Sequence, residues 1–452
     1  MNFIRFDVTF SGHNEFRGVF MNSLWNATAQ KGSFPVLEGD IRTDVVIVGG
    51  GLAGVMCLKE LNDRGVDCVL LEAKTIGSGV TANTTAKITF QHGLIYDKLI
   101  KKYGTEKALM YLSANRNALE KYKKLSEIHS CYSEEKDAYV YSSDDREKIE
   151  REIKAYEKLG VNAGYCDDIP LPVRCAGAVK IKNQAQFHPL KLLYSVAENL
   201  KIYENSKVIE FLPDKVKCNN GSVTAEKIIV TTHFPIINKH GAFSLKLYQH
   251  RSYVTAIDNA PDINGMYLDE KQNGFSFRNY KNLLLVGGGD HRTGKTGGSY
   301  NVLYDFCRKN YPDSHVKYSF ATQDCMSLDG MPYIGRYSDS SRGIYVATGF
   351  NKWGMTSSLV AADILGDMVT GRKNEYQELF APDRSVMHPQ LFANIFHSFT
   401  GFITPTVPRC PHLGCALKYN KEEHSWDCPC HGSRFSENGK LIDNPATDDL
   451  KK

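Results

Sequence analysis

Apolar and polar residues near the start of the chain follow the pattern of a strand, a helix and a second strand. Residues 44–48 (DVVIV) form a short apolar run, as a strand buried on both faces does. Residues 52–62 then carry apolar side chains at helical spacing, and residues 68–71 (CVLL) form a second apolar run. This order predicts a β–α–β unit within a parallel sheet.

Further along, the pattern changes between helical and strand periods. Residues 94–129 and 144–159 have helical spacing with many charge pairs four residues apart, which predicts two helices. Residues 250–257 and 275–280 alternate as strands do. Residues 391–405 (LFANIFHSFTGFITP) are apolar but short and broken by polar residues, so we expect a packed or docking helix there.

Composition indicates an ordinary globular chain of two or three domains. The 452 residues are 42% hydrophobic and 23% charged, and the net charge of +4 without a basic run argues against a nucleic-acid partner. We find neither a membrane span nor a secretory signal, so we expect a cytoplasmic protein whose eight scattered cysteines are reduced. Residues 1–20 show no period and are predicted to be a disordered extension, with structure beginning at Met21.

The turn after the first predicted strand has the composition of a dinucleotide site. Gly49, Gly51 and Gly54 form a G-x-G-x-x-G motif, and Glu72 directly follows the second strand. Gly49 would allow the tight turn, Gly51 would let the backbone approach a pyrophosphate, and Gly54 would let helix pack on strand. Glu72 would accept a hydrogen bond from a ribose hydroxyl. The alternative, a glycine turn in an ordinary α/β unit, leaves Glu72 unexplained.

Two further segments favour FAD over NAD. Residues 77–89 (GSGVTANTTAKIT) are small and hydroxyl-rich, and residues 225–236 (AEKIIVTTHFPI) indicate another buried strand of the same sheet. Both suit a long dinucleotide lying across the sheet. Residues 282–294 (NLLLVGGGDHRTG) also follow a strand pattern with glycines, but Arg292 takes the place of the last glycine and no acid-ended strand follows. We therefore expect a glycine-rich strand end there and a single dinucleotide domain.

The first four-fifths of the chain resembles the D-amino-acid-oxidase/glycine-oxidase superfamily of FAD enzymes. The segments that carry the resemblance are QFHPLKLL (186–193), SKVIEF (206–211), DGMPYIG (329–335) and GIYVATGFNKWGM (343–355). The pairing of D-G-x-P-x-I-G with A-T-G-F is more specific than the glycine motif. The resemblance implies that the backbone of Val208 meets the adenine and that Gly349, Gly354 and Met355 lie beside the isoalloxazine.

One position departs from that family. Members that oxidise amino acids commonly have an arginine five residues before the Asp of D-G-x-P, where it binds the substrate carboxylate. Here that position is Asp324, so an α-amino acid is disfavoured and a cationic or neutral group is expected. The catalytic residues stay unknown, and the candidate pocket residues are Asp324, Lys87 and Trp353. Three other arginines could replace the missing one or form ion pairs elsewhere: Arg251, Arg278 and Arg336.

The end of the chain concentrates metal-binding side chains. Cys410, His412, Cys428 and His431 form a C-x-H…C-x-x-H pattern with 15 residues between its halves. Two cysteines and two histidines suit a Rieske [2Fe–2S] centre or a tetrahedral zinc site. Zinc fingers usually pair cysteine with cysteine and histidine with histidine, whereas each half is mixed here, which favours the Rieske centre.

The segment also resembles Rieske proteins in its linking sequences, HLGC and CPCHGS. The resemblance implies that the two cysteine ligands hold one iron and the two histidines the other. It further implies that Cys415 and Cys430 form a disulfide that ties the two loops over the cluster. A disulfide knot without metal is a remaining alternative. Few residues precede the first ligand loop, so we expect a truncated domain that leans on the flavin domain.

The whole chain resembles bacterial fusions of a D-amino-acid-oxidase-like FAD domain with a C-terminal Rieske domain. The expected fold is a Rossmann-like α/β FAD domain, an inserted α+β substrate domain with an antiparallel sheet, and a small all-β Rieske domain. The expected boundaries are residues 21–90, 184–245 and 325–375 for the FAD domain, 91–183 and 246–324 for the substrate domain, 376–409 for a linker with a helix, and 410–452 for the Rieske domain.

This resemblance implies an oxidoreductase with two cofactors, FAD and a [2Fe–2S] cluster. FAD would accept two electrons from a small, amine-like substrate, and the cluster would pass them singly to a partner protein. One alternative is an oxygen-reducing flavin oxidase with a vestigial cluster. Another is a non-enzymatic redox sensor or electron-transfer protein. A Rieske oxygenase is disfavoured, because no convincing two-histidine, one-carboxylate iron site follows the cluster.

Overall fold

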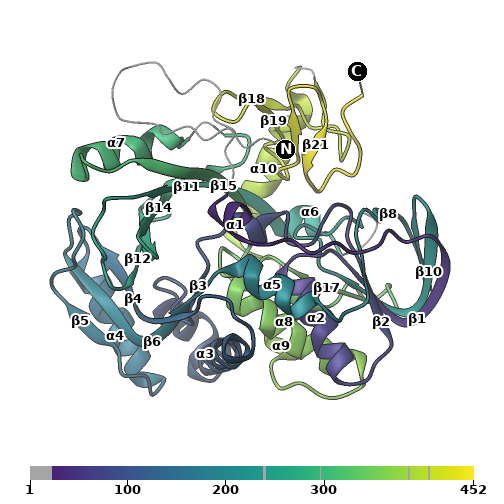
Figure 1. Ribbon diagram of the computed structural model, residues 1–452, viewed down its shortest axis with the longest axis horizontal. Coiled ribbons are helices and arrows are strands. Elements are labelled where there is room, and N and C mark those ends of the chain that lie inside the picture. Colours follow the sequence, from purple (N-terminus) through teal and green to yellow (C-terminus); the bar gives the residue numbers. More distant parts are fainter. Residues whose placement is uncertain (1–22, 238–240, 296, 385–386, 406–407, 452) are drawn as a thin grey trace.

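Three β-sheets organise the computed structural model of the chain (Figure 1). The model describes residues 23–451 apart from 238–240, 296, 385–386 and 406–407. The predicted extension, residues 1–20, therefore lies outside the described residues. In Figure 1 the first sheet lies on the right, the second on the left, and the third, small sheet at the top above both.

The first sheet has a parallel centre, as the β–α–β pattern predicts. Its path is β16-β17-β10-β1-β2-β7, and the neighbours from β17 to β7 are parallel. Its strands are β1 (Gly39–Val48), β2 (Cys68–Leu71), β7 (Ile202–Tyr203), β8 (Val208–Leu212), β9 (Lys215–Cys218), β10 (Gly221–Val230), β16 (Tyr333–Arg336) and β17 (Ile344–Thr348). All four residues of β2 are buried, which explains its unbroken apolar sequence.

Helices cover this sheet and bury its apolar residues. α8 (Gly354–Val369) packs against α2 (Leu52–Asp63) and α3 (Tyr96–Ile128), and α5 (Pro189–Ala197) packs against α2. Because neighbours surround α8, it is buried on nearly every side. The short helices of this region are α1 (Leu24–Thr28), the 3₁₀ turn η1 (Val80–Asn83), α6 (Phe243–Lys246) and α9 (Gln377–Phe380).

The second sheet is largely antiparallel, as expected for an inserted substrate domain. Its path is β15-β11-β14-β13-β12-β4-β6-β3, with β5 beside β6 and one parallel pair, β12 with β4. Its strands are β3 (Lys87–Ile88), β4 (Glu134–Ser142), β5 (Gly164–Cys166), β6 (Gly177–Gln186), β11 (Leu247–Ile257), β12 (Met266–Asp269), β13 (Ser276–Tyr280), β14 (Leu283–Arg292) and β15 (Val316–Ser327). The glycine-rich residues 282–294 thus lie mainly in an antiparallel strand, as interpreted from the sequence.

Helices α3, α4 (Arg146–Lys158) and α7 (Tyr300–Asn310) accompany this sheet. The two predicted helices at 94–129 and 144–159 correspond to α3 and α4. α3 is kinked at Gly104, whose φ of 84° lies in the left-handed region.

A small antiparallel sheet closes the chain. It contains β18 (Lys418–Asn420), β19 (Ser425–Asp427), β20 (Arg434–Ser436) and β21 (Leu441–Asp443), in that order. We refer to residues 408–451 as the C-terminal lobe. Helix α10 (Pro389–Ile403) precedes the lobe and lies beneath it in Figure 1. Within the described part of the chain, no helix has the length and apolar character needed to cross a membrane.

Candidate cofactor sites

The glycine turn between β1 and α2 leaves an open space above its backbone. Gly49 has a φ of +112°, and a Cβ there would lie 2.8 Å from the carbonyl oxygen of Thr231. A Cβ on Gly54 would lie 1.9 Å from the carbonyl oxygen of Gly49, so only glycine lets α2 approach this closely. At Gly51 the nearest atom to such a Cβ is Thr81 Oγ1, at 3.6 Å. The face of Gly51 is therefore free for a ligand.

That free face opens into a cavity of about 610 Å³. Seven of the residues predicted to contact FAD line this cavity: Gly49, Gly51, Glu72, Val208, Gly349, Gly354 and Met355. Gly54 does not, because it packs α2 against β1. The cavity lies at the carboxyl ends of β1 and β10, at the N-terminus of α2, where an α/β sheet holds dinucleotides. The residues present therefore fit FAD.

Glu72 is held in place at the wall of this cavity. Its Oε2 accepts a hydrogen bond from the backbone N–H of Gly50 at 2.7 Å, and its Oε1 accepts one from the N–H of Lys74 at 2.7 Å. Burial raises the pKa of the carboxyl group, and the two N–H donors act against that shift. The side chain is thus fixed where an incoming hydroxyl group could donate to it.

Asp324 also lines the cavity and is half-buried. Burial raises its pKa to about 6, the Lys352 ammonium acts in the opposite direction, and the Asp290 carboxylate adds to the rise. Lys352 forms an ion pair with Asp290. Above pH 6 the Asp324 carboxyl group is ionised, and because the Lys352 ammonium is paired with Asp290, this part of the cavity wall presents a negative charge.

Lys352 belongs to a strained loop beside the cavity, and the sequence reasoning missed it. Gly349, Asn351 and Lys352 have φ values of 69°, 51° and 71°. Left-handed backbone costs free energy at residues other than glycine, and it gathers at functional sites. The loop follows β17 and leads into α8, so it directs Asn351 and Lys352 toward the cavity wall.

The two other candidate pocket residues lie outside the cavity. Lys87 is half-buried in the second sheet, where its Nζ donates to the carbonyl oxygen of Tyr267 at 3.2 Å. Burial, assisted by the Arg278 guanidinium, lowers the pKa of Lys87 to about 7. Trp353 stacks on His92 with ring centroids 4.5 Å apart. Neither side chain is in the lining of the cavity.

None of the three other arginines offers an unpaired guanidinium to the cavity. Arg278 is fully buried, and its Nη1 donates to the carbonyl oxygens of Thr85 and Ala86 at 2.8 and 2.7 Å. Arg336 is exposed on β16 and does not line the cavity. Arg251 lines the cavity but is paired with Glu423 of the C-terminal lobe.

The four predicted metal ligands come together in the C-terminal lobe. The thiols of Cys410 and Cys428 are within hydrogen-bonding contact. The rings of His412 and His431 have centroids 4.9 Å apart. Burial lowers the pKa of His412 to about 4 and that of His431 to about 3, so both imidazoles are in the neutral form that binds metal.

A [2Fe–2S] cluster fits this set of donors. Two sulfurs lie side by side and two imidazoles lie side by side, as ligation of one iron by cysteines and the other by histidines requires. The buried Nδ1 of His431 has no hydrogen-bond partner among the described residues, and such an atom normally has one.

Cys415 and Cys430 form a disulfide that joins the two ligand loops. The sulfurs of Cys415, Cys428 and Cys430 all lie within 4.8 Å of one another. Because two of these sulfurs are bonded to each other, the group offers a single free thiol and is not itself a metal site. Gly401 of α10 packs against the disulfide, since a Cβ there would lie 2.5 Å from Sγ of Cys430.

The C-terminal lobe forms part of the wall of the large cavity. Seven residues near the end of the lobe line it: Leu441, Ile442, Asp443, Asn444, Ala446, Thr447 and Asp449. Lys207 donates to the carbonyl oxygen of Thr447, and Asn444 Nδ2 donates to the carbonyl oxygen of Phe234 at 3.0 Å. Sequence reasoning missed these residues, because no motif or spacing signals a contact between segments so far apart in the chain.

Phe234 connects the two sites. It follows β10, and its ring centroid lies 6.3 Å from those of both His412 and His431. Its neighbours Thr232 and His233 line the large cavity. The histidine side of the lobe therefore faces the sheet that carries the glycine turn.

A buried ion pair, backed by a charge network within the lobe, joins the lobe to the second sheet. Glu423 accepts hydrogen bonds from Arg251 Nε at 2.7 Å and from Arg434 Nη2 at 2.9 Å. Arg434 also pairs with Asp427 at 3.0 Å and Asp443 at 3.1 Å. Burial by itself would raise the pKa of Glu423, but the two guanidinium groups outweigh it and lower the pKa to about 2. The lobe and β11 thus share one charge network.

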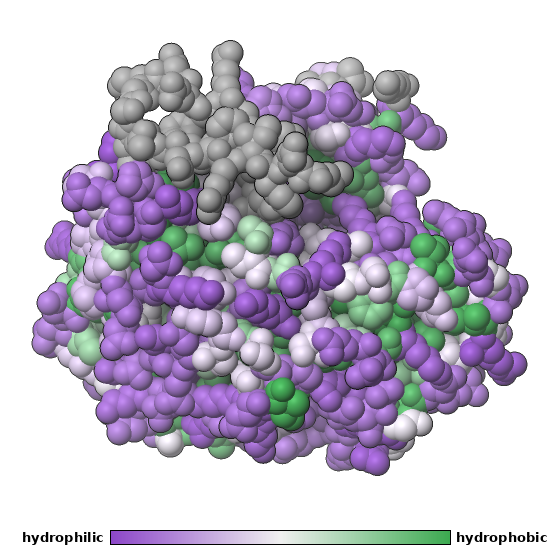
Figure 2. Space-filling model, in the orientation of Figure 1, coloured by the Kyte–Doolittle hydropathy of each residue, from purple (hydrophilic) through white to green (hydrophobic). Residues whose placement is uncertain are grey.

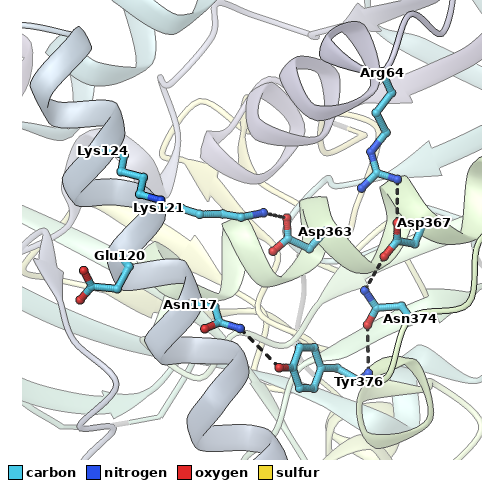
Figure 3. Close-up of a pocket in the computed structure, with 9 residues that line it drawn as sticks. All are labelled: Arg64, Asn117, Glu120, Lys121, Lys124, Asp363, Asp367, Asn374 and Tyr376. Atoms are coloured by element: carbon cyan, nitrogen blue, oxygen red, sulfur yellow. Dashed lines mark hydrogen bonds and ion pairs between the residues drawn. The ribbon is translucent and has the colours of Figure 1, made fainter.

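A second cavity, of about 410 Å³, lies between α2, α3 and α8 (Figure 3). Its charged groups pair with one another. Lys121 pairs with Asp363, and Arg64 with Asp367 at 2.8 Å. Asn374 also donates to Asp367, at 2.8 Å. These contacts tie three helices together, so a structural role accounts for the polar lining.

Comparison with known families gives two matches. Residues 44–368 match the family described as FAD dependent oxidoreductase. Residues 392–452 match the Rieske [2Fe-2S] domain, so that match begins within α10.

Individual proteins resemble the chain over most of its length. It is 34% identical to the Rieske 2Fe-2S iron-sulfur protein YhfW of Bacillus subtilis, over 95% of this chain and 97% of that protein. It is 23% identical to the gamma-glutamylputrescine oxidoreductase of Escherichia coli, over 86% of this chain and 95% of that protein. Glycine oxidase from Geobacillus kaustophilus has a similar fold, with a TM-score of 0.65 and 20% identity over 76% of this chain and 100% of the other.

Proposed function

The chain belongs to the FAD dependent oxidoreductase family and carries a C-terminal Rieske [2Fe-2S] domain, and from this premise we propose that it oxidises a small amine and delivers the electrons singly to a partner protein. When bound, FAD supplies two-electron oxidation and the [2Fe–2S] cluster supplies one-electron transfer. The main support is that the two cofactor sites adjoin. Residues between 441 and 449 of the lobe line the cavity that fits FAD, and the ring of Phe234 lies against both predicted cluster histidines.

We assign the cofactor contacts as the sequence predicts. The glycine turn and Glu72 would hold the pyrophosphate and ribose of FAD, and the loop after β17 would lie beside its ring. Cys410 and Cys428 would bind one iron, and His412 and His431 the other. The disulfide between the two loops would shield the cluster from water.

The charges at the cavity wall support an amine as substrate. Asp324 adds a negative charge to the wall, and the positive charge of its neighbour Lys352 is paired with Asp290, so this part of the wall would stabilise a protonated amine and disfavour a free carboxylate. One relative, the gamma-glutamylputrescine oxidoreductase of Escherichia coli, is named for an amine. An amine that loses two electrons and two protons becomes an imine, and two equivalents of a one-electron acceptor take up the electrons.

The test compares two routes for the electrons. Holoprotein and a His431→Ala variant are reduced anaerobically with a panel of primary amines and then assayed with ferricenium, a one-electron acceptor, or with dioxygen. We expect amines to reduce the flavin in both proteins and the variant to lose turnover with ferricenium. His424→Ala is the matched control, because His424 lies in the same lobe but is 71% exposed at the side chain. Electron paramagnetic resonance of the reduced proteins reports whether the cluster is present.

Two outcomes would reject the proposal. Equal turnover with dioxygen in both proteins, with no use of ferricenium, would favour an oxygen-reducing oxidase with a vestigial cluster. Absence of flavin reduction by any amine, amino acid or hydroxy acid would favour a redox sensor.

A further inference from the structure

Helix α10 turns its apolar side outward. Its large apolar residues recur at helical spacing and form one stripe, which we call the α10 face: Phe392, Ile395, Phe396, Phe399, Phe402 and Ile403. The side chains at 392, 396 and 399 are 60–62% exposed. The buried residues of the helix are Asn394 and Gly401. A helix that packs on a core does the opposite, so the described part of the chain leaves the α10 face uncovered.

The inward side of α10 is fixed by polar contacts. Asn394 Nδ2 donates to the carbonyl oxygen of Leu245 at 3.0 Å, and Asn394 Oδ1 accepts from Arg292 at 3.0 Å. Gly401 packs against the disulfide of the lobe. Arg409 donates to carbonyl oxygens in the last turn of the helix, including that of Phe402 at 3.1 Å. The outward orientation of the apolar stripe is therefore built in by specific contacts.

Positively charged side chains lie near the α10 face. From Arg384 to Lys421 the sequence contains no aspartate or glutamate. Lys295 and Lys418 lie near His397 of the helix, where they add to the larger effect of burial in lowering its pKa to about 4. The face drawn in Figure 2, by contrast, is mainly hydrophilic with apolar residues in small separate groups.

We propose that the α10 face binds the surface of a bilayer that contains anionic lipid. The phenylalanines would enter the boundary between headgroups and acyl chains, and Lys295 and Lys418 would meet lipid phosphates. A protein partner fits less well, because the stripe offers no hydrogen-bonding side chains to fix an orientation, whereas protein interfaces carry many hydrogen bonds. This inference does not depend on the proposed function. Because Gly401 packs against Cys430, binding would place the cluster-bearing lobe beside the lipid.

The test is flotation of the full-length holoprotein with vesicles. Phosphatidylcholine vesicles are compared with vesicles of phosphatidylcholine and phosphatidylglycerol, at low and high salt. We expect binding to the anionic vesicles that weakens with salt. The triple variant Phe392→Ser, Phe396→Ser, Phe399→Ser should bind at least about a hundredfold more weakly, because three buried aromatic side chains are lost. Lys295→Gln with Lys418→Gln should weaken binding about tenfold, on the anionic vesicles alone.

The control variant carries Leu109→Ser, Ile128→Ser and Ile209→Ser, three exposed apolar residues on other elements, and should bind as the unaltered protein does. All variants keep the flavin and cluster spectra if they fold. No binding to anionic vesicles, or equal loss in the control, overturns the proposal. Light scattering gives a third outcome that overturns the proposal. If the unaltered protein is a dimer, the triple Phe variant is a monomer and neither binds vesicles, the α10 face binds a second copy of the chain instead.

Discussion

Single residues of the glycine turn have separable roles, which a pair of substitutions can distinguish. A Cβ on Gly51 meets no atom of the chain closer than 3.6 Å, so the branches of Gly51→Val would extend into the cavity. We predict a folded protein that lacks flavin but keeps the cluster. Gly54→Val is the contrasting control, because its Cβ would lie 1.9 Å from a carbonyl oxygen and the domain should lose stability. Flavin absorbance per protein measures FAD content, and thermal unfolding measures the stability of both variants. Stoichiometric FAD in Gly51→Val would contradict the assignment of the glycine turn to FAD.

A second residue-level prediction concerns Asp324. With its pKa raised to about 6, the group is neutral below pH 6 and charged above it. If it binds a protonated amine, kcat/KM should rise as pH increases through 6 and then level off. Asp324→Asn should remove this rise and lower kcat/KM at pH 8 by roughly 10–100-fold, mainly through KM, as loss of a charged hydrogen bond does.

Asp290→Asn provides the companion measurement. It removes the like charge that helps to raise the pKa of Asp324, so the rise should shift to lower pH. A flat profile in the unaltered protein, or an unchanged profile in Asp324→Asn, shows that this carboxylate does not meet the substrate's charge.

For the helices, the spacing of apolar residues predicted where an element forms but not which of its sides faces the core. The spacing of apolar residues in 94–129 and 391–405 predicts helices, and α3 and α10 occupy those segments. The spacing of α10 does not reveal that its apolar stripe faces outward, because the period gives the angle between side chains and not the side that meets the core. That choice is made by Asn394 and Gly401, whose partners come from distant segments.

Strand β11 and the C-terminal lobe are joined by Glu423, which leads to a stability prediction. Its pKa falls from 4.5 unfolded to about 2 folded, so this stabilisation is complete above pH 4.5 and is lost as pH falls from 4.5 to 2. The shift corresponds to about 3 kcal/mol. Glu423→Gln leaves Arg251 and Arg434 buried with one anion fewer and should lower the free energy of unfolding by about 3–5 kcal/mol at pH 7.

Denaturant unfolding, monitored by cluster absorbance, measures this free energy at pH 7. In acid unfolding monitored by fluorescence, the difference in stability between Glu423→Gln and the unaltered protein should shrink toward pH 2. Glu437→Gln, on the same lobe but exposed, should leave the midpoint unchanged. Equal midpoints for Glu423→Gln and the unaltered protein would show that the network does not hold the lobe.

At the scale of the whole molecule, the sequence predicts two cofactor sites and a lobe that leans on the flavin domain, but not which residues form the wall that the two sites share. The glycine turn and the paired Cys and His residues are local motifs, so each can be found from spacing alone. Asn444 and Phe234 meet across more than two hundred residues, and neither has a distinctive neighbourhood in the sequence. Lys352 is likewise recognisable only from its left-handed backbone beside the cavity.

The position of the lobe gives a prediction for electron transfer between the two sites. Gly294 has a φ of +73°, and a Cβ there would lie 2.5 Å from the backbone nitrogen of Pro429, beside the cluster ligands. Gly294→Ala should therefore push the lobe away from Phe234 and slow flavin-to-cluster transfer. Gly160→Ala carries the same kind of left-handed strain at a φ of +70°, but nothing lies within 4 Å, so it should leave the rate unchanged.

Anaerobic stopped-flow absorbance, with flavin and cluster bands followed separately, measures the transfer rate in both variants. Because the lobe is held by the Arg251–Glu423 ion pair and by the hydrogen bond from Gln323 to the carbonyl oxygen of Gly432, the rate in the unaltered protein should also be independent of solvent viscosity. A rate that falls with added glycerol, together with no effect of Gly294→Ala, would mean that the lobe leaves its place against Phe234 in order to exchange electrons. The fixed arrangement predicts instead that only the outer partner must diffuse, and that transfer to it alone depends on viscosity and on partner concentration.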